Sequence, residues 1–296
     1  MKTRLLLMLT PGLLAAASLS AQLAPLNERI AVSATAAPDY VRPHDGMTGL
    51  RPEGYIVTPG HHVESGTRDR SIEALPFNKL VGQLAPDLAR QSYFPARSAD
   101  TADLLIVVHW GVSQVYDDPQ KDSRMDALKN ALPELQAQVR ENGMGDAAPM
   151  NDIYDSLEWA QDNSRAAFWR NARLLGYVRE LQRFGAENGY QSDREKLLSA
   201  ELSEERYFVV LMAYDYQAMK KEKRSRLLWT TRLSVRTAGN NFTEALPVLA
   251  QAGSHVFGKQ VDGLVHAKAN LREGRVTFGE MKVLGVVGEQ TPTPGR

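Results

Sequence analysis

Residues 104–110 have the sequence LLIVVHW, and this run decides the fold. Seven consecutive residues carry no charge, and β-branched side chains dominate the centre. A strand that is apolar on both faces is typical of the middle of a sheet covered on both sides. Asp103 precedes the run and Gly111 follows it. We therefore expect a central strand here, ending at the glycine.

Further strands are expected towards the C-terminus. Residues 207–216 read YFVVLMAYDY. In residues 227–237 a mainly apolar set and a mainly polar set of side chains follow each other with a period of two. Alternation with a period of two marks a half-exposed antiparallel strand. The charged residues 220–226 lie between the two runs and indicate a solvated hairpin loop. Shorter strands are predicted at residues 55–58 and within residues 275–287.

Apolar residues at three- and four-residue spacing predict the helices. Pro86 should kink or break the first of them, and Asn241 with Glu244 resembles a capping box. The predicted helices are residues 76–91, 122–142, 151–184, 193–202 and 242–257. The order predicts an α+β (mixed α/β) fold: a small mixed or antiparallel sheet, helices packed on it, and a helical insertion at about 116–203 between its halves.

The first 21 residues resemble a secretory signal. Lys2 and Arg4 precede an apolar run over residues 5–17, and small residues follow. The alternatives are a misannotated start and an uncleaved anchor, although the run is shorter than the roughly 20 residues that cross a bilayer. We expect export to the periplasm or exterior of a bacterium, with no membrane span after signal removal. Residues 22–52 are expected to form a flexible or irregular leader, 53–287 the domain, and 288–296 a disordered tail.

Composition narrows the function classes. The 296 residues include no cysteine, so neither disulfides nor a lipoprotein anchor is available. Thirty-five basic residues balance thirty-five acidic ones. Loss of residues 1–21 removes Lys2 and Arg4 and no acid, which leaves a formal net charge of −2. A near-neutral chain is not expected to bind nucleic acid.

Ser113 directly follows the central strand, where a hydrolase nucleophile would sit. Asp215 and His255 follow in the chain order of a hydrolase triad. Val115, however, replaces the second glycine of the nucleophile turn. A triad is defined by geometry rather than by order, so a plain strand-ending serine is the competing interpretation.

His61, His62 and Glu64 are candidate metal ligands on one loop, but one histidine pair makes only half a site. Nothing in the sequence joins His109 to that loop. Solvated histidines are the alternative, and no cofactor is predicted. Aromatic side chains on the predicted strands should form sheet core. Trp159 and Trp169 should pack the inserted helices together.

Residues 93–96 (YFPA) and 102–107 (ADLLIV) resemble secreted bacterial envelope proteins of the DUF4136-like kind. In that group a later strand carries a tryptophan, matched here by Trp229, and a closing helix, matched by residues 242–257. The resemblance implies a small α/β envelope domain and carries over no catalytic residue. The long insertion and the missing lipoprotein cysteine depart from the group.

The leading hypothesis is an exported, non-catalytic protein that acts through contacts with an envelope protein. A secreted hydrolase using Ser113 is the first alternative. A small-ligand or metal-binding module near His61 and His62 is the second.

Overall fold

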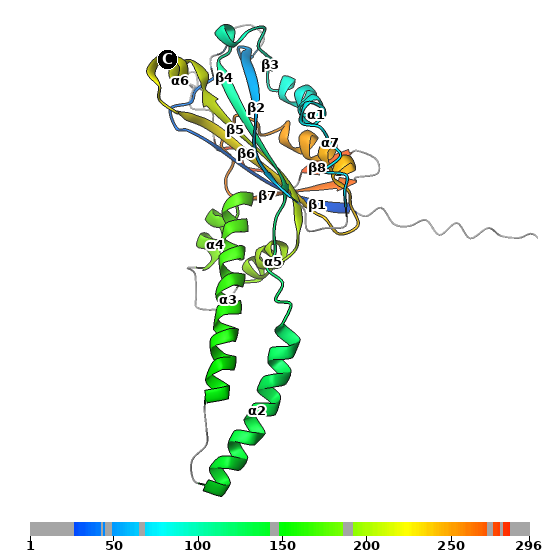
Figure 1. The fold of residues 1–296 in the computed structure, drawn as a ribbon. Coiled ribbons are helices and arrows are strands. Elements are labelled where there is room, and N and C mark those ends of the chain that lie inside the picture. The colour runs from blue at the N-terminus through cyan, green and yellow to red at the C-terminus, as the bar shows by residue number, and fades with distance from the viewer. Residues whose placement is uncertain are drawn as a thin grey trace, which may run out of the picture.

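An open sheet of eight strands forms the centre of the protein (Figure 1). The computed structural model describes residues 27–42, 44, 49–64, 69–142, 148–185, 192–270, 275–278 and 281–284. Across the sheet the strands are β3 (Tyr93–Pro95), β2 (Glu53–Val63), β4 (Leu104–Val112), β5 (Arg206–Asp215), β6 (Leu227–Arg236), β1 (Asn27–Ala36), β7 (Val265–Asn270) and β8 (Arg275–Phe278).

The sheet is mixed. β2 is parallel to β3 and β4, and all the remaining pairs are antiparallel. The predicted central strand is β4, which lies between β2 and β5. Its register places Leu104 beside Asp215 at one end and Val112 beside Tyr207 at the other. The predicted α+β class with helices on one mixed sheet is confirmed.

One face of the sheet is covered by α1 (Phe77–Ala89) and α7 (Phe242–Gly253) (Figure 1). α1 buries Leu80, Leu84 and Leu88, which recur every four residues and so share one side of the helix. The Asn241 side chain accepts a hydrogen bond from the Glu244 backbone N–H at 2.9 Å, so the predicted cap of α7 is confirmed. These helices enclose the main core around Ile106, Trp229 and Phe257 on the strands and loops.

The opposite face is covered near one end by the last turns of α3 (Ala148–Leu175), by α4 (Val178–Gly185) and by α5 (Asp193–Leu202). Gly176 separates α3 from α4 with a φ of +85°. A Cβ at this glycine would lie 2.7 Å from the Ser33 side chain on β1. The close approach and the positive φ both require glycine. The single helix predicted over residues 151–184 is therefore two helices.

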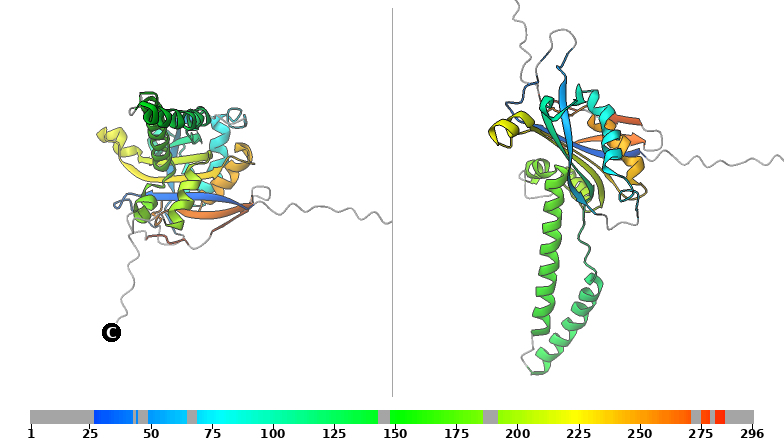
Figure 2. Two further views of the ribbon diagram at one scale, coloured as in Figure 1. Left: turned by 90° about the horizontal axis from the view of Figure 1, so that it is seen from below. Right: turned by 45° about the horizontal axis from the view of Figure 1, so that its top comes forward.

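The inserted helices extend far from the sheet. α2 (Lys121–Asn142) packs beside α3, and the two project together (Figures 1 and 2). We call residues 121–142 and 148–169 the arm. At 1.5 Å per residue, the 28 residues of α3 span about 42 Å. Among the described residues, no helix combines the length and apolar character required to cross a bilayer.

Other expectations require correction. Residues 27–36 form β1, between β6 and β7, so the predicted irregular leader at 22–52 contains an inner strand of the sheet. α1 continues through Pro86. The expected 220–226 loop begins inside a short helix, α6 (Tyr216–Glu222). The predicted signal at 1–21 and tail at 288–296 lie outside the described residues.

Candidate functional site

Ser113, Asp215 and His255 do not come together. Ser113 lies just beyond β4 and is 1% exposed, and its Oγ accepts a hydrogen bond from the Arg206 backbone N–H at 2.9 Å. Asp215 lies at the far end of the β4–β5 pair, roughly 25–30 Å away at 3.3 Å per residue. There it caps α6 by accepting a hydrogen bond from the Ala218 N–H. The serine thus joins two strands, and the predicted triad is not formed.

His255 follows α7, whose helix covers the face of the sheet that holds the main core. Its ring meets the Phe278 ring edge-on, with 4.9 Å between the centroids. Burial, helped by the charges of Lys259 and Arg90, lowers the pKa of His255. The ring therefore packs against an aromatic neighbour.

The histidines of β2 contact residues of the neighbouring strand β4. The His62 ring stacks on Trp110 at 4.9 Å, and the His61 backbone N–H donates to His109 Nδ1 at 2.8 Å. Burial, followed by the charge of His61, lowers the pKa of His109, which fits a neutral ring that accepts this bond. Within the described ranges, no group of three His, Cys, Asp or Glu side chains is placed to hold a metal, and Glu64 is exposed.

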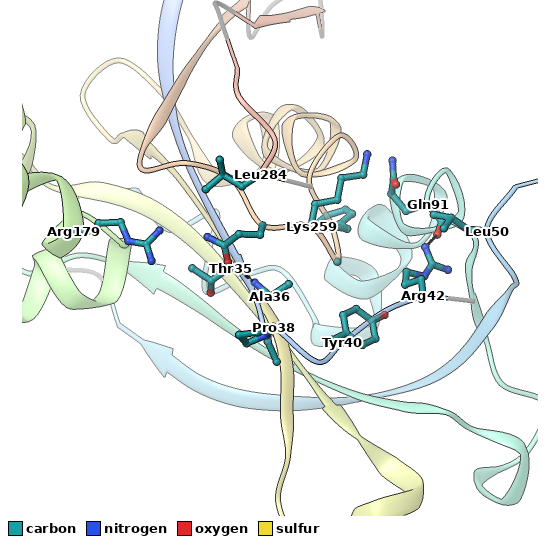
Figure 3. A pocket seen from close by; sticks show the side chains of 14 residues that line it. Thr35, Ala36, Pro38, Tyr40, Arg42, Leu50, Gln91, Arg179, Lys259 and Leu284 are labelled. Carbon is teal, nitrogen blue, oxygen red and sulfur yellow. Dashed lines mark hydrogen bonds between the residues drawn. The ribbon is translucent and has the colours of Figure 1, made fainter. Parts of the chain in front are cut away.

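A large cavity lies elsewhere, over the end of β1 (Figure 3). Its volume is about 720 Å³. The lining comes from the end of β1 and the segment after it, the loop after α7, and single residues of other elements. These are Thr35, Ala36, Ala37, Pro38, Tyr40, Arg42, Leu50, Gln91, Arg179, Phe257, Gly258, Lys259, Gln260 and Leu284. Most of the lining is apolar, and its charged members are all cationic.

Backbone geometry shapes the floor of this cavity. Gly258 has a φ of +72°, and a Cβ at this position would lie 1.8 Å from the Tyr93 hydroxyl. Only glycine allows this approach. Lys259 follows, and its Nζ donates to the His255 carbonyl at 3.0 Å. Burial, followed by the charge of Arg42, lowers the pKa of this lysine.

A buried ion pair closes one end of the cavity. The Arg42 side chain is 4% exposed, and its Nε donates to Glu53 Oε2 at 3.0 Å. Its guanidinium lies 4.1 Å from the centre of the Tyr93 ring, within the range of a cation–π contact. The Tyr40 hydroxyl donates to the same Glu53 oxygen at 2.7 Å. The Arg42 charge is therefore neutralised, in contrast to Arg179 at the other end of the cavity (Figure 3).

The arm exposes a second candidate surface. Trp159 is 59% exposed, Tyr154 is 52% exposed and Trp169 is 37% exposed. Trp159 meets Tyr116 edge-on at 6.4 Å, but most of its surface lies open. The expectation that Trp159 packs the inserted helices together is therefore wrong. The expectation of sheet core holds for Tyr207, Phe208 and Trp229, which are at most 1% exposed.

Comparison with protein-family models gives no match, and no curated protein matches the sequence. The resemblance to DUF4136-like proteins accordingly stays a prediction, carried by the residues that suggested it.

Proposed function

We propose that this chain is an exported, non-catalytic binding protein of a bacterial envelope, and that the arm makes contact with a protein partner. The observation that carries the proposal is the exposure of Trp159 at 59% on a helix that projects from the sheet. Tryptophan and tyrosine are enriched at the energetic centres of protein interfaces. Each buries 150–250 Å² when it is covered.

The chemistry of the described residues favours binding over catalysis. Ser113 is 1% exposed and bonded to Arg206, and Asp215 caps a helix. Neither side chain is available for the hydrolase alternative. The near-neutral charge supports a protein partner rather than a polyanion.

Cleavage of the predicted signal at residues 1–21 tests export. Sequencing the N-terminus of the protein recovered from an envelope fraction should show removal of about 21 residues. Deleting residues 2–21 should leave the protein in the cytoplasm. Recovery of an intact N-terminus from the envelope would contradict a cleaved signal.

Site-specific crosslinking tests the arm. A photoreactive amino acid at Trp159, in cells that export the chain, should give one discrete adduct. The matched control is Gln161, which is exposed two residues further on and faces away from Trp159 on the helix. Excess wild-type protein should compete the adduct away, whereas the Trp159→Ala protein should not. Equal adducts from both positions, or none from Trp159, would refute the proposed contact.

A further inference from the structure

A second pocket of about 370 Å³ adjoins the large cavity, with Thr35 and Arg179 lining both. It lies where the junction of α3 and α4 meets the sheet. Its lining is Ser33, Thr35, Arg173, Gly176, Val178, Arg179, Arg232, Val261 and Gly263. Three arginines come from three elements, α3, α4 and β6, and no carboxylate lines either pocket.

These three arginines have no counter-charge in the part of the chain that the structure describes. Within the described residues, no ion pair or side-chain hydrogen bond joins the guanidinium of Arg173, Arg179 or Arg232 to another group. By contrast, the neighbouring Arg183 on α4 lies 3.8 Å from Glu180 and 3.7 Å from Asp262. The two arginines of α4 therefore differ, since among the described residues Arg183 lies beside two carboxylates and Arg179 beside none.

The missing counter-charge affects the pKa of Arg232. This arginine is half-buried on β6, and Gly176 packs against its aliphatic stem, since a Cβ on that glycine would lie 3.0 Å from Arg232 Cδ. Burial lowers the pKa of Arg232, and no carboxylate acts against this effect. The nearby Glu180 lies against Gly263 and pairs with Arg183. An anion bound in the pocket would supply the missing charge.

The ligand must also suit the adjoining cavity. There Ala36, Pro38, Phe257 and Leu284 provide apolar surface, and Arg179 extends from α4 towards Thr35 (Figure 3). Binding sites of this size combine apolar walls with a few polar groups that fix orientation. Guanidinium groups match carboxylate and phosphate oxygens in a bidentate geometry.

We propose that the two adjoining pockets bind an anionic amphiphile, with its phosphate or carboxylate among Arg173, Arg179 and Arg232 and its hydrocarbon part along the apolar cavity. This site is separate from the arm, so it stands independently of the proposed protein contact.

The affinity for two probes, measured by calorimetry with the chain that lacks the predicted signal at residues 1–21, tests the ligand class. Dodecyl phosphate and dodecanoate are the two anionic probes, and they separate phosphate from carboxylate recognition. Binding of either one supports the proposal. Shortening the alkyl chain from dodecyl to octyl and butyl should weaken binding stepwise, because less apolar surface is buried. Failure of both probes to bind would overturn the proposal, and so would equal binding of dodecanol or inorganic phosphate.

Paired variants locate the site. The Arg173→Gln/Arg179→Gln protein should lose at least tenfold in affinity for the tighter probe, since charge-assisted hydrogen bonds are among the strongest. Both positions are exposed on helices, so the fold should persist. Arg170→Gln is the matched control, because Arg170 lies one turn before Arg173 on α3, is exposed, and does not line the pocket. An equal loss in the control, or an unchanged affinity in the double variant, would overturn the assignment.

Discussion

Glu201 and His266 join the inserted helices to the C-terminal part of the sheet. Glu201 Oε2 on α5 lies 2.9 Å from His266 Nε2 on β7, although 65 residues separate them in the chain. The Tyr177 hydroxyl donates to the same oxygen at 2.8 Å, and Arg29 lies 3.5 Å from the other carboxylate oxygen. The carboxylate is only 10% exposed, so its ionisation is coupled to folding.

The first prediction concerns acid stability. Burial alone would raise the pKa of Glu201, but the His266 hydrogen bond, the charges of His266 and Arg206, and the Tyr177 hydrogen bond lower it from 4.5 to about 2. Because the folded-state pKa is the lower one, this stabilisation is present above pH 4.5 and is lost as the pH falls towards 2. It amounts to about 3 kcal/mol.

Urea unfolding from pH 7 to pH 2 measures this effect. Glu201→Gln should be less stable than the wild type at pH 7, and the difference should shrink below pH 4.5. Glu204→Gln, at an exposed position nearby, is the control and should follow the wild type. A gap between Glu201→Gln and wild type that does not change with pH would contradict the coupling.

The second prediction concerns the junction of α3 and α4. Gly176→Ala should destabilise the protein by about 2–4 kcal/mol, since the new Cβ meets Ser33 and the backbone has a positive φ. Gly82→Ala is the control, because nothing lies within 4 Å of its Cβ and it sits inside α1. That change should stabilise the protein by about 0.5–1 kcal/mol. The melting temperatures of both variants are compared with that of the wild type. Equal shifts in the two variants would contradict the proposed crowding at Gly176.

The third prediction concerns the ion pair at the end of the large cavity. Arg42→Ala leaves the half-buried Glu53 without its charged partner and should cost about 3 kcal/mol. The Arg42→Ala/Glu53→Ala double variant should lose less free energy of unfolding than the two single variants lose in sum. A double-mutant cycle measured by chemical denaturation tests this coupling. Additive effects would show that the pair contributes no interaction energy.

The fourth prediction separates the structural role of Ser113 from a catalytic one. Ser113→Ala should destabilise the protein by about 1–2 kcal/mol, because the buried Arg206 N–H loses its acceptor. Ester hydrolysis by the purified protein should be at background level before and after the change. An esterase activity that disappears in Ser113→Ala, with the fold intact by circular dichroism, would restore the hydrolase hypothesis.

Local sequence patterns predicted the parts of the fold that depend on local interactions. The run at residues 104–110 and the cap at Asn241 both appear where expected. β1 was missed because its small and polar side chains show no strong pattern. Residues 27–36 form a strand because they pair with β6 and β7, which lie more than 190 residues away in sequence. Ala31 and Ser234 are one such pair.

The candidate site could not be predicted for a related reason. Thr35, Arg179 and Lys259 meet at one cavity from segments that are widely separated in the chain. An arginine on an amphipathic helix gives no sign of whether a carboxylate will face it. The unpaired state of Arg173 and Arg232 follows from packing across elements, so it becomes visible only in three dimensions.

The insertion also has a consequence for the order of folding. Val112 and Tyr207 are neighbours across β4 and β5, so every residue between them belongs to one loop that the strand pair must close. Closing a loop of roughly ninety residues costs about 3 kcal/mol more than closing a four-residue turn. Early formation of α2 and α3 would shorten the effective loop and reduce this entropy loss. We therefore expect the arm to form before β4 and β5 pair. The part of the protein that projects furthest would then increase the rate at which the sheet forms.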